Sequence, residues 1–335
     1  MKTRHVCVVG AGVVGLSSAV CIQEQLPDVH VTLVADKFSP HTTSDGSGGF
    51  WCPHDLGNTP EALIRKWGKE TLDYILSLIK SSDAAVVQAQ MLSGYMMSSS
   101  VQEEPDYKDL CFGYRLMTSE ELKDFPNMKW GYFYTTVQID VKPYMQWLMR
   151  RFKERGGRVE VQTVSSIDQL SKHCDVIVNC CGLRGGILGC DKEVYPIRGQ
   201  VMRVVAPWIK HFYICLDEGS ETYFIPGTTN IVIGGTEQVN RWDEEVDEND
   251  HQRIWKRAVR CIPSIQHAKI VTRWVGLRPA RSTVRLEAER KNNSVWIVHN
   301  YGHGGSGVTL HWGCAQHAAS LVGDCLRKLE STSRL

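Results

Sequence analysis

The chain has 335 residues, of which 42% are hydrophobic and 22% charged, and its formal net charge is +1 at pH 7. This composition is typical of a globular protein with one large or two medium domains, and no apolar run approaches the ~18–20 residues of a membrane span. A near-neutral charge gives no support for a nucleic-acid or membrane-surface partner, because either would require a basic face.

A strand, a glycine-rich turn and a helix are predicted at the start of the chain. Residues 1–5 lead directly into the apolar run 6–9, so we expect no secretory signal peptide. The turn Gly10-Ala11-Gly12-Val13-Val14-Gly15 follows, then a helix from Gly12 to about Gln25, and a strand over 30–35 that ends before Asp36. Such a turn presents N–H groups and the positive end of a helix to a phosphate, and an acid after the second strand commonly meets a ribose hydroxyl. The pattern predicts a dinucleotide-binding unit.

The middle of the chain alternates between helical and extended patterns. We expect helices over 69–80, from Thr118, from Pro143 to Gly156, and over 250–260. Extended segments are expected over 131–138, 159–161, 175–179, 199–205, 223–225, 230–234 and 270–275. The predicted fold class is α/β: a Rossmann-like FAD-binding domain interleaved with a mainly antiparallel α+β substrate domain. The first domain would comprise residues 1–50, 141–192 and 288–335, and the second 51–140 and 193–287.

A second glycine-rich turn lies near the end of the sequence. The strand-like run 295–298 leads into Tyr301-Gly302-His303-Gly304-Gly305-Ser306-Gly307 and a helical stretch. Two such turns in sequence-distant segments suggest one large anionic cofactor between them, which favours FAD over NAD. We interpret His303 as part of the loop or of the cofactor's surroundings, not as a group that transfers protons.

The 12 cysteines are dispersed and include no CxxC pair. We interpret them as free thiols of a reducing compartment, several of them buried: Cys7, Cys21, Cys180 and Cys181. We expect no metal site, because no metal-ligand spacing is evident. The sequence shows neither a Ser-His-Asp grouping nor a Walker-type loop.

Three residues could carry substrate chemistry. Arg278 stands at a strand end before a proline, where its planar guanidinium could bind a carboxylate with two hydrogen bonds, although a surface arginine is the alternative. Tyr223 offers a phenol at the head of a strand, a place where tyrosine is commonly packed. His54 lies in a loop after Cys52-Pro53, where histidine is usually solvated. The residue pattern alone leaves these alternatives open.

The chain resembles the D-amino-acid oxidase and D-aspartate oxidase family of flavoproteins nearly from end to end. The matching motifs are Val9-Gly10-Ala11-Gly12-Val13-Val14-Gly15-Leu16-Ser17, Ala35-Asp36-Lys37-Phe38, Thr42-Thr43-Ser44-Asp45, Leu92-Ser93-Gly94, Val176-Ile177-Val178-Asn179-Cys180, Arg198-Gly199-Gln200, Pro226-Gly227-Thr228, Gly276-Leu277-Arg278-Pro279 and Asn300-Tyr301-Gly302-His303-Gly304-Gly305. The residues of these motifs resemble those of D-aspartate oxidase most closely.

The resemblance implies an FAD-dependent oxidase that converts a D-amino acid and O₂ to a 2-oxo acid, ammonia and hydrogen peroxide. The flavin N5 would accept the hydride, so no side chain need act as acid or base. Arg278 would clamp the α-carboxylate with help from Tyr223, His54 would lie at the substrate, and the backbone near Gly305 or Ser306 would hold the amino group. The implied cofactor contacts are Gly10, Ala11, Gly12, Val13, Val14, Gly15, Asp36, Lys37, Thr43, Ser44, Gly48, Gly49, Phe50, Val164, Cys181, Gly304, Gly305, Gly307, Val308 and Thr309.

The sequence is divided over the preferred substrate. The motifs Val275-Gly276-Leu277-Arg278-Pro279 and Gly234-Gly235-Thr236-x-Gln238, His54 after Pro53 and the short loop 215–222 favour acidic D-amino acids, D-aspartate and D-glutamate. Glu237 argues against them, because vertebrate D-aspartate oxidases resemble this chain but carry arginine there, and a carboxylate would repel an acidic substrate. His54, Arg241 or Ser306 could compensate. We expect an acidic preference, with neutral D-amino acids as the alternative.

Two further points concern binding of FAD and location. Gly46-Ser47-Gly48 and Cys181 replace residues that are bulkier or carry hydroxyl groups in similar flavoproteins, which would loosen binding of FAD. Ser333-Arg334-Leu335 resembles the peroxisomal address Ser-Lys-Leu, so we expect recognition by the import receptor and a location in the peroxisome matrix. An FAD-linked dehydrogenase, an N-methyl-amino-acid oxidase and a catalytically silent protein of this fold are the alternatives to an oxidase.

Overall fold

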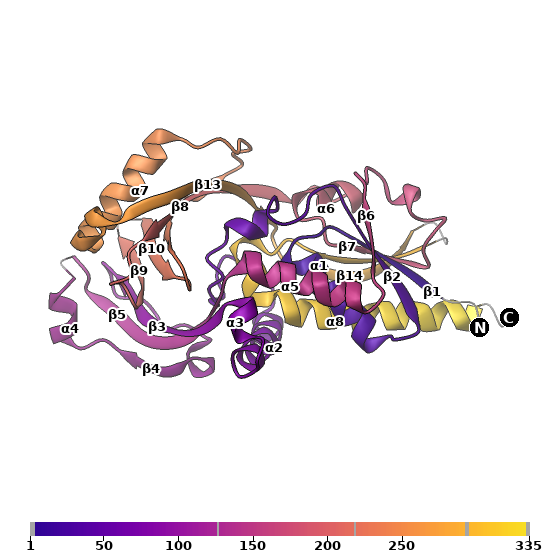
Figure 1. Cartoon of the computed structure of the whole chain (residues 1–335), viewed down its shortest axis with the longest axis horizontal. Helices are drawn as coiled ribbons and strands as arrows, with labels where there is room; N and C mark the ends of the chain where they lie inside the picture. Colours follow the sequence, from indigo (N-terminus) through magenta and orange to yellow (C-terminus); the bar gives the residue numbers. More distant parts are fainter. Residues whose placement is uncertain (1–3, 126, 218, 292–294, 333–335) are drawn as a thin grey trace.

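The computed structural model describes residues 4–125, 127–217, 219–291 and 295–332. Two parts lie side by side along the long axis, with β1 and the end of α8 at one extremity and α4 and α7 at the other (Figure 1). Each part is built around its own sheet. In the described ranges, each helix is too short or too polar to span a lipid bilayer.

The first sheet has, among the described residues, six strands in the order β14-β15-β7-β1-β2-β6. The strands are β1 Arg4–Val9, β2 Val29–Ala35, β6 Arg158–Val161, β7 Val176–Asn179, β14 Arg285–Lys291 and β15 Val295–Tyr301. All neighbouring pairs are parallel except β14 with β15. Every residue of β7 is buried, as expected for a central parallel strand of apolar composition.

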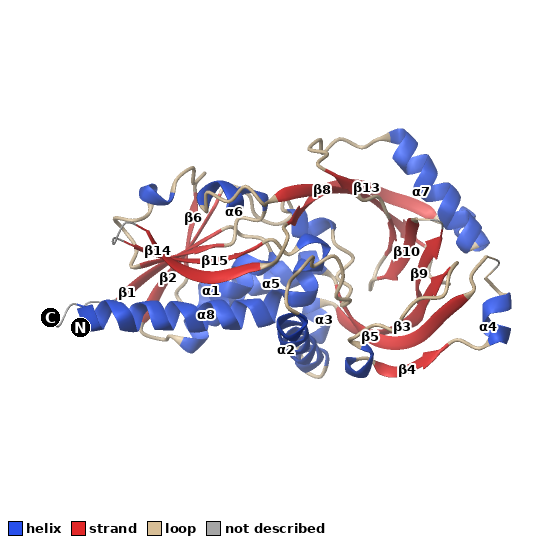
Figure 2. Cartoon of the chain, turned by 180° about the vertical axis from the view of Figure 1, so that it is seen from behind, coloured by secondary structure: helices blue, strands red, loops and turns tan. Residues whose placement is uncertain are grey.

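The helices of this part pack on the sheet or on one another. They are α1 Val13–Gln25, α2 Glu61–Ile79, α3 Ala84–Val87, α5 Val141–Glu154, α6 Leu183–Leu188 and α8 Gly307–Thr332. α2 and α3 pack on α8 and α5 and on β3 (Ala89–Ser98). α1, α5 and α8 lie against one face (Figure 2). Their apolar residues, such as Leu16, Leu148 and Val322, form one core with Val6 and Val8 of the central strand. The glycine-rich turn between β1 and α1 is therefore fixed by packing on both sides.

The second sheet has, in the described ranges, nine strands in the order β12-β8-β11-β10-β9-β3-β5-β4, with β13 paired to β8. The strands are β3 Ala89–Ser98, β4 Phe112–Leu116, β5 Trp130–Ile139, β8 Tyr195–Val205, β9 Phe212–Asp217, β10 Ser220–Pro226, β11 Ile231–Gly234, β12 Gln238–Val239 and β13 Lys269–Ala280. Pairing is antiparallel except between β3 and β9. The remaining helices are α4 Ser119–Lys123 and α7 Glu248–Cys261. Ile254 and Ala258 of α7 pack on Phe224 and Ile233, so α7 covers one face of β10 and β11.

The predicted fold class is confirmed, since a largely parallel sheet is interleaved in sequence with a mainly antiparallel one. Several boundaries differ. α2 begins at Glu61, and not at Lys69, and it contributes Leu72 and Ile75 to the core of the first sheet, although the predicted division placed it in the substrate domain. The predicted boundary at 287/288 falls inside β14. The division into two domains stays a prediction.

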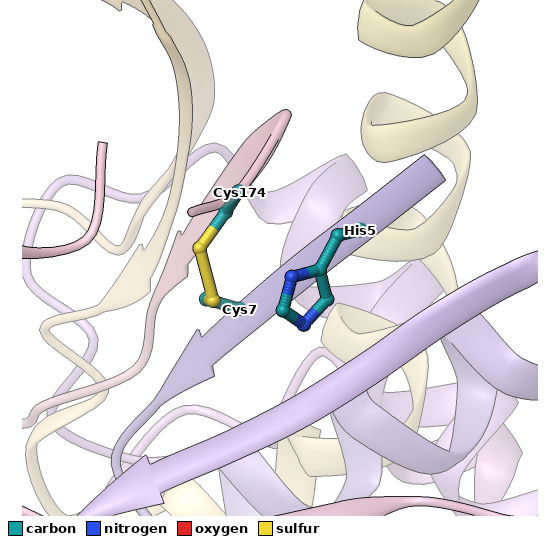
Figure 3. A group of neighbouring side chains, drawn as sticks. All are labelled: His5, Cys7 and Cys174. Atoms are coloured by element: carbon teal, nitrogen blue, oxygen red, sulfur yellow. A yellow bond between two sulfur atoms is a disulfide. The ribbon is translucent and has the colours of Figure 1, made fainter. Parts of the chain in front are cut away.

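The interpretation of all cysteines as free thiols is wrong for Cys7 and Cys174. They form a disulfide with their Cα atoms 6.0 Å apart, across 167 residues of sequence (Figure 3). Adjacent parallel strands bring the pair together, a contact that sequence spacing cannot show. Cys21 and Cys180 are buried free thiols, as expected, and burial raises the pKa of Cys180 to about 12.

His5 lies beside this disulfide (Figure 3) and with it forms the one candidate metal-ligand group among the described residues. Both sulfur atoms are consumed by the disulfide. The two ring nitrogens of His5 are hydrogen-bonded, Nδ1 with His173 O at 2.6 Å and Nε2 with Thr32 Oγ1 at 2.8 Å. This group therefore offers no free ligand atom.

Candidate active site

A cavity of about 1230 Å³ lies between the two sheets. Its wall is formed on one side by the loops that follow β1, β2 and β7, and on the other by one face of β8 to β10 and by β13. The cavity is larger than the usual site for a small ligand. Open α/β sheets bind cofactors at the loops that follow the carboxyl ends of their parallel strands, which is where this cavity lies.

Most of the predicted cofactor contacts lie in this wall. They are Gly10, Ala11, Gly12, Val13, Val14, Asp36, Lys37, Thr43, Ser44, Gly48, Phe50, Val164, Cys181, Gly304, Gly305, Gly307 and Val308. They come from segments far apart in sequence, which the fold brings to one cavity. Gly15, Gly49 and Thr309 are not in the wall.

The β1–α1 turn has the geometry of a phosphate site. Gly10 has φ +105°, and a Cβ there would lie 2.4 Å from the carbonyl oxygen of Cys180, so only glycine fits. Gly12 is the N-cap of α1 and supplies no side-chain cap. Since the first N–H groups of a helix have no partner within it, they are available to an anion. Ser44 Oγ accepts from the first of them, Val13 N, at 3.1 Å.

Gly15, Gly49 and Thr309, which lie outside the wall, support its loops by close packing or by hydrogen bonds. A Cβ on Gly15 would lie 1.9 Å from Gly10 O, so this glycine lets α1 approach the turn. Gly49, at φ +67°, lies against Ile139 O in the same way. Thr309 Oγ1 accepts from Cys52 N and donates to Cys52 O, and so holds the loop that carries His54.

Gly46 and Gly48 make room for the other sheet. A Cβ on Gly46 would lie 2.2 Å from the ring of Trp274, and one on Gly48 2.8 Å from Ile225. Both of these bulky side chains also line the cavity. The volume that small residues leave in the loop is thus filled by Trp274 and Ile225, which the sequence expectation of loose cofactor binding did not consider. Gly276 also lies tight against the Trp274 ring. A glycine two residues after this tryptophan is the sequence signal that could have indicated how the ring packs.

Asp36 lies in the cavity wall directly after β2. It forms an ion pair with Arg184, Nη1 to Oδ2, at 2.6 Å. Arg184 belongs to α6 and also lines the cavity. The acid expected to meet a ribose is therefore held in place from the segment after β7.

Two buried polar atoms of wall residues have no hydrogen-bond partner in the described part of the chain. His303 Nε2 and Asn300 Oδ1 are buried without a hydrogen bond, and both residues line the cavity. Burial lowers the pKa of His303 to about 4, so its imidazole is neutral at pH 7. Orphaned donors and acceptors of this kind fit a polar ring system such as a flavin. Together with the glycine turn, they show that the residues present suit FAD.

Arg278 and Tyr223 lie close together in the cavity wall. Arg278 Nη1 donates to Thr236 O at 3.0 Å, and within the described residues the guanidinium forms no ion pair. The ring and hydroxyl of Tyr223 lie against Gly234 and Gly235, where a side chain would collide with them. Burial raises the pKa of Tyr223, and Arg278 opposes that rise, so the phenol stays protonated and can donate. The structure thus brings together two of the predicted substrate residues.

His54 also lines the cavity, next to Gly305. Its Nδ1 is 2.9 Å from Cys52 O, and a Cβ on Gly305 would lie 2.5 Å from its Nε2. Burial lowers the pKa of His54, but its interactions with Cys52 and Asp55 outweigh that effect and raise it to about 9.

Ser306 is not among the residues that line the cavity, and its contact with the substrate stays a prediction. Its amide donates to His303 O at 2.9 Å. Its hydroxyl accepts from His54 N at 2.9 Å and donates to His54 O at 2.5 Å. The hydroxyl therefore holds the turn to the His54 loop, while the amide is bonded within the turn.

Two of the carboxyl groups in the cavity wall interact with the charge of Arg278. Glu237 was singled out in the sequence, but Glu221, which also lines the wall, was not. Burial raises the pKa of both groups, and Arg278 opposes the rise. The signal that could have found Glu221 is its position two residues before Tyr223 on the same strand, since alternate residues of a strand share a face.

Comparison with known proteins identifies the family. A family model described as FAD dependent oxidoreductase matches residues 5–321. The chain belongs to this family. It is 38% identical to D-aspartate oxidase of Homo sapiens, over 99% of this chain and 98% of that protein. It is 34% identical to D-amino acid oxidase of Dugesia ryukyuensis, over 97% and 99%.

Solved structures agree with this FAD-dependent oxidoreductase in fold. Glycine oxidase from Bacillus cereus ATCC 14579 matches with a TM-score of 0.79 and 17% identity, over 97% of this chain and 98% of that one. L-alpha-glycerophosphate oxidase from Mycoplasma pneumoniae, solved with FAD bound, matches with a TM-score of 0.71 and 16% identity, over 96% and 95%. The predictions of family, fold class and FAD as cofactor are confirmed.

Proposed function

We propose that this FAD-dependent oxidoreductase deaminates free D-amino acids, with O₂ as the electron acceptor and hydrogen peroxide as a product. The observation that carries the proposal is the guanidinium of Arg278, unpaired by any described carboxylate and beside Tyr223, in the same cavity as the dinucleotide turn. The relatives named D-aspartate oxidase and D-amino acid oxidase support it.

The chain's own residues bind and orient. When bound, FAD supplies the hydride acceptor. The β1–α1 turn, Asp36 and the turn around Gly304 would hold the cofactor. Arg278 would bind the α-carboxylate with paired hydrogen bonds, and the Tyr223 hydroxyl would donate to it. Such positioning lowers the barrier without an acid or base from the protein.

The preference for acidic D-amino acids stays a prediction, and the charges of the site argue against it. Two of the three groups that could offset Glu237 are engaged elsewhere. Arg241 Nε binds Asp243 at 2.6 Å and its Nη2 binds Asp247 at 3.2 Å, and Arg241 is not part of the cavity wall. Ser306 is occupied by the His54 loop. Only His54 is left as a candidate partner for a second carboxylate.

The test uses the purified protein loaded with FAD. We expect O₂ uptake and peroxide formation with D-amino acids and none with their L-enantiomers, and anaerobic loss of the flavin's visible absorption with D-amino acids. A flavin that no D-amino acid reduces would refute the proposal. Uptake with sarcosine alone would indicate an N-methyl-amino-acid oxidase, and flavin reduction without O₂ uptake a dehydrogenase.

We further propose a location in the peroxisome matrix, where peroxide is destroyed. The support is the sequence Ser333-Arg334-Leu335, which lies outside the described residues. A fluorescent protein fused to the N-terminus should give punctate fluorescence that overlaps a peroxisomal marker. Removal of the three residues should make it diffuse, and unchanged puncta would contradict import through this address.

A further inference from the structure

The face of β10 that lines the cavity carries a carboxyl group. Glu221, Tyr223 and Ile225 all line the cavity, whereas Phe224 packs beneath α7 on the opposite face. This follows from the alternation of side chains along a strand. Glu221 therefore lies two positions from the tyrosine that contacts the substrate, about 7 Å along the strand.

A second carboxyl group comes from the segment that follows the next strand, β11. Gly234 is the cross-strand partner of Tyr223, and the chain continues through Thr236, whose carbonyl accepts from Arg278, to Glu237. Glu237 thus follows directly on the residue that braces the guanidinium. Burial and then the nearby charge of Asp55 raise the pKa of Glu237.

Carboxyl groups outnumber cations at this end of the cavity. Glu221, Glu237 and Glu244 line the wall, and within the described residues none of the three forms an ion pair. The cations nearby are Arg278, His54 and Arg257. Arg257 is not in the wall, and its Nη2 is bound to Gly235 O at 2.6 Å. Lys37 and Arg184 belong to the Asp36 end.

This excess has a consequence once a substrate binds. The α-carboxylate would take the charge of Arg278. The charged wall groups left for the substrate's side chain would then be Glu221 and Glu237, with His54 as the remaining cation. Glu221 is half-buried and Glu237 exposed in the open cavity, so a bound side chain would remove both carboxyl groups from water. A carboxylate buried without a cation is costly, so we expect a positive group on the substrate to complete the site. A guanidinium or ammonium at the end of a D-amino acid's side chain supplies that group.

We propose that Glu221 and Glu237 select D-amino acids with a cationic side chain, of the class of D-arginine and D-lysine. The inference rests on the proposed function and names the substrate class of the same site. A guanidinium can bind a carboxylate with two parallel hydrogen bonds, whereas a second carboxylate on the substrate would be repelled. Selection thus has both an attractive and a repulsive part.

The first experiment measures kcat/KM of the FAD-loaded enzyme on matched substrates. D-citrulline has nearly the shape of D-arginine without its charge, and D-methionine serves the same purpose for D-lysine. We expect kcat/KM for D-arginine to exceed that for D-citrulline by about tenfold or more and that for D-aspartate by about a hundredfold or more, because charged hydrogen bonds are replaced first by neutral ones and then by repulsion.

The second experiment changes the carboxyl groups. Glu221→Gln and Glu237→Gln keep the shape and remove the charge, and each should lower kcat/KM for D-arginine by about ten- to a hundredfold but that for D-citrulline by less than about threefold. Glu245→Gln is the matched control, an exposed acid next to Glu244 that is not in the cavity wall. Glu237→Arg should raise the rate on D-aspartate. Flavin content is measured for every variant to show that it folds.

The outcomes separate the two proposals. If no D-amino acid reduces the flavin, the proposed function fails. If D-aspartate or the neutral substrates are oxidised faster than D-arginine, or if the two glutamine variants lower all substrates equally, only the selection by Glu221 and Glu237 is overturned.

Discussion

In the proposed function, orientation of the substrate depends on Arg278. Removing one partner of a buried charge pair costs about 3–5 kcal/mol, and about 1.4 kcal/mol is a factor of ten. We therefore expect Arg278→Ala to lower kcat/KM by about a hundred- to several-thousand-fold for every D-amino acid that the enzyme oxidises. Steady-state peroxide assays would measure it.

Arg273→Ala is the matched control. Arg273 lies on the same strand, β13, but pairs with Glu248 at the surface, Nη1 to Oε2 at 2.7 Å. Surface pairs contribute little, so activity should stay within about twofold. A loss below tenfold for Arg278→Ala would remove that residue from the clamp role.

The contact of Gly46 with Trp274 is a second test at the residue scale. A Cβ at position 46 would lie 2.2 Å from the indole, so Gly46→Ala overpacks the site and should cost about 1–3 kcal/mol of stability and weaken FAD binding. Adding Trp274→Leu should recover part of the loss, because the two residues share one space.

Gly323→Ala in α8 is the control, since the nearest atom to its Cβ would be 3.4 Å away. Fluorescence titration with FAD and thermal unfolding would give both quantities. Additive losses in the double variant would contradict a direct contact between positions 46 and 274.

At the scale of elements, the disulfide joins the strand before the glycine turn to the start of its neighbour. Cys174 lies just before β7, and Cys7 lies within β1. A cross-link restricts the unfolded chain, so Cys174→Ser should lower the free energy of unfolding by about 2–5 kcal/mol. Denaturant unfolding without reductant would measure this, and reductant should bring the wild type to the level of the variant.

Cys190→Ser is the matched control for the disulfide, because Cys190 is a free and exposed thiol. It should unfold like the wild type in both conditions. Alkylation of the unfolded, unreduced wild type at all 12 cysteines would show that the disulfide is not formed.

Elements with a strong local pattern were predictable, and elements defined by their neighbours were not. The β1–α1–β2 unit follows from an apolar run, glycines and an acid within 36 residues of sequence. α4 follows from the capping box of Thr118 and Glu121, which the structure contains. By contrast, β14 is rich in charged residues because it is an edge strand, and its pairing with β15 alone makes it a strand.

For the whole molecule, a buried histidine makes stability depend on pH. Burial lowers the pKa of His311 from 6.5 to about 4, while its Nε2 bonds to Tyr144 OH at 2.8 Å. Between these two pH values the unfolded chain binds the proton and the folded protein does not, so acid favours unfolding. The stabilisation is complete above pH 6.5 and falls by up to about 3 kcal/mol as pH drops to about 4.

Denaturant unfolding at a series of pH values measures this loss. His311→Gln should remove that part of the pH dependence, whereas His30→Gln, at an exposed position, should leave the slope unchanged. An identical slope in the wild type and His311→Gln would contradict a buried neutral imidazole.

The sequence by itself determined the family, the cofactor and the interleaving of two sheets. Glycine turns and apolar strands are formed by residues close together in the sequence, so their patterns can be recognised there. Glu237 was visible as a departure from the pattern. What only the tertiary structure decided is the charge of the proposed substrate site: that Glu221 shares its face with Tyr223, that the charge of Asp55 acts on Glu237, and that Arg241 and Ser306 are engaged elsewhere. The tertiary structure alone also decided the Cys7–Cys174 bond and the contact of Trp274 with Gly46. Each of these contacts depends on which sequence-distant segments the folded chain brings within a few ångströms of each other. The spacing of residues along the sequence does not give that distance in space.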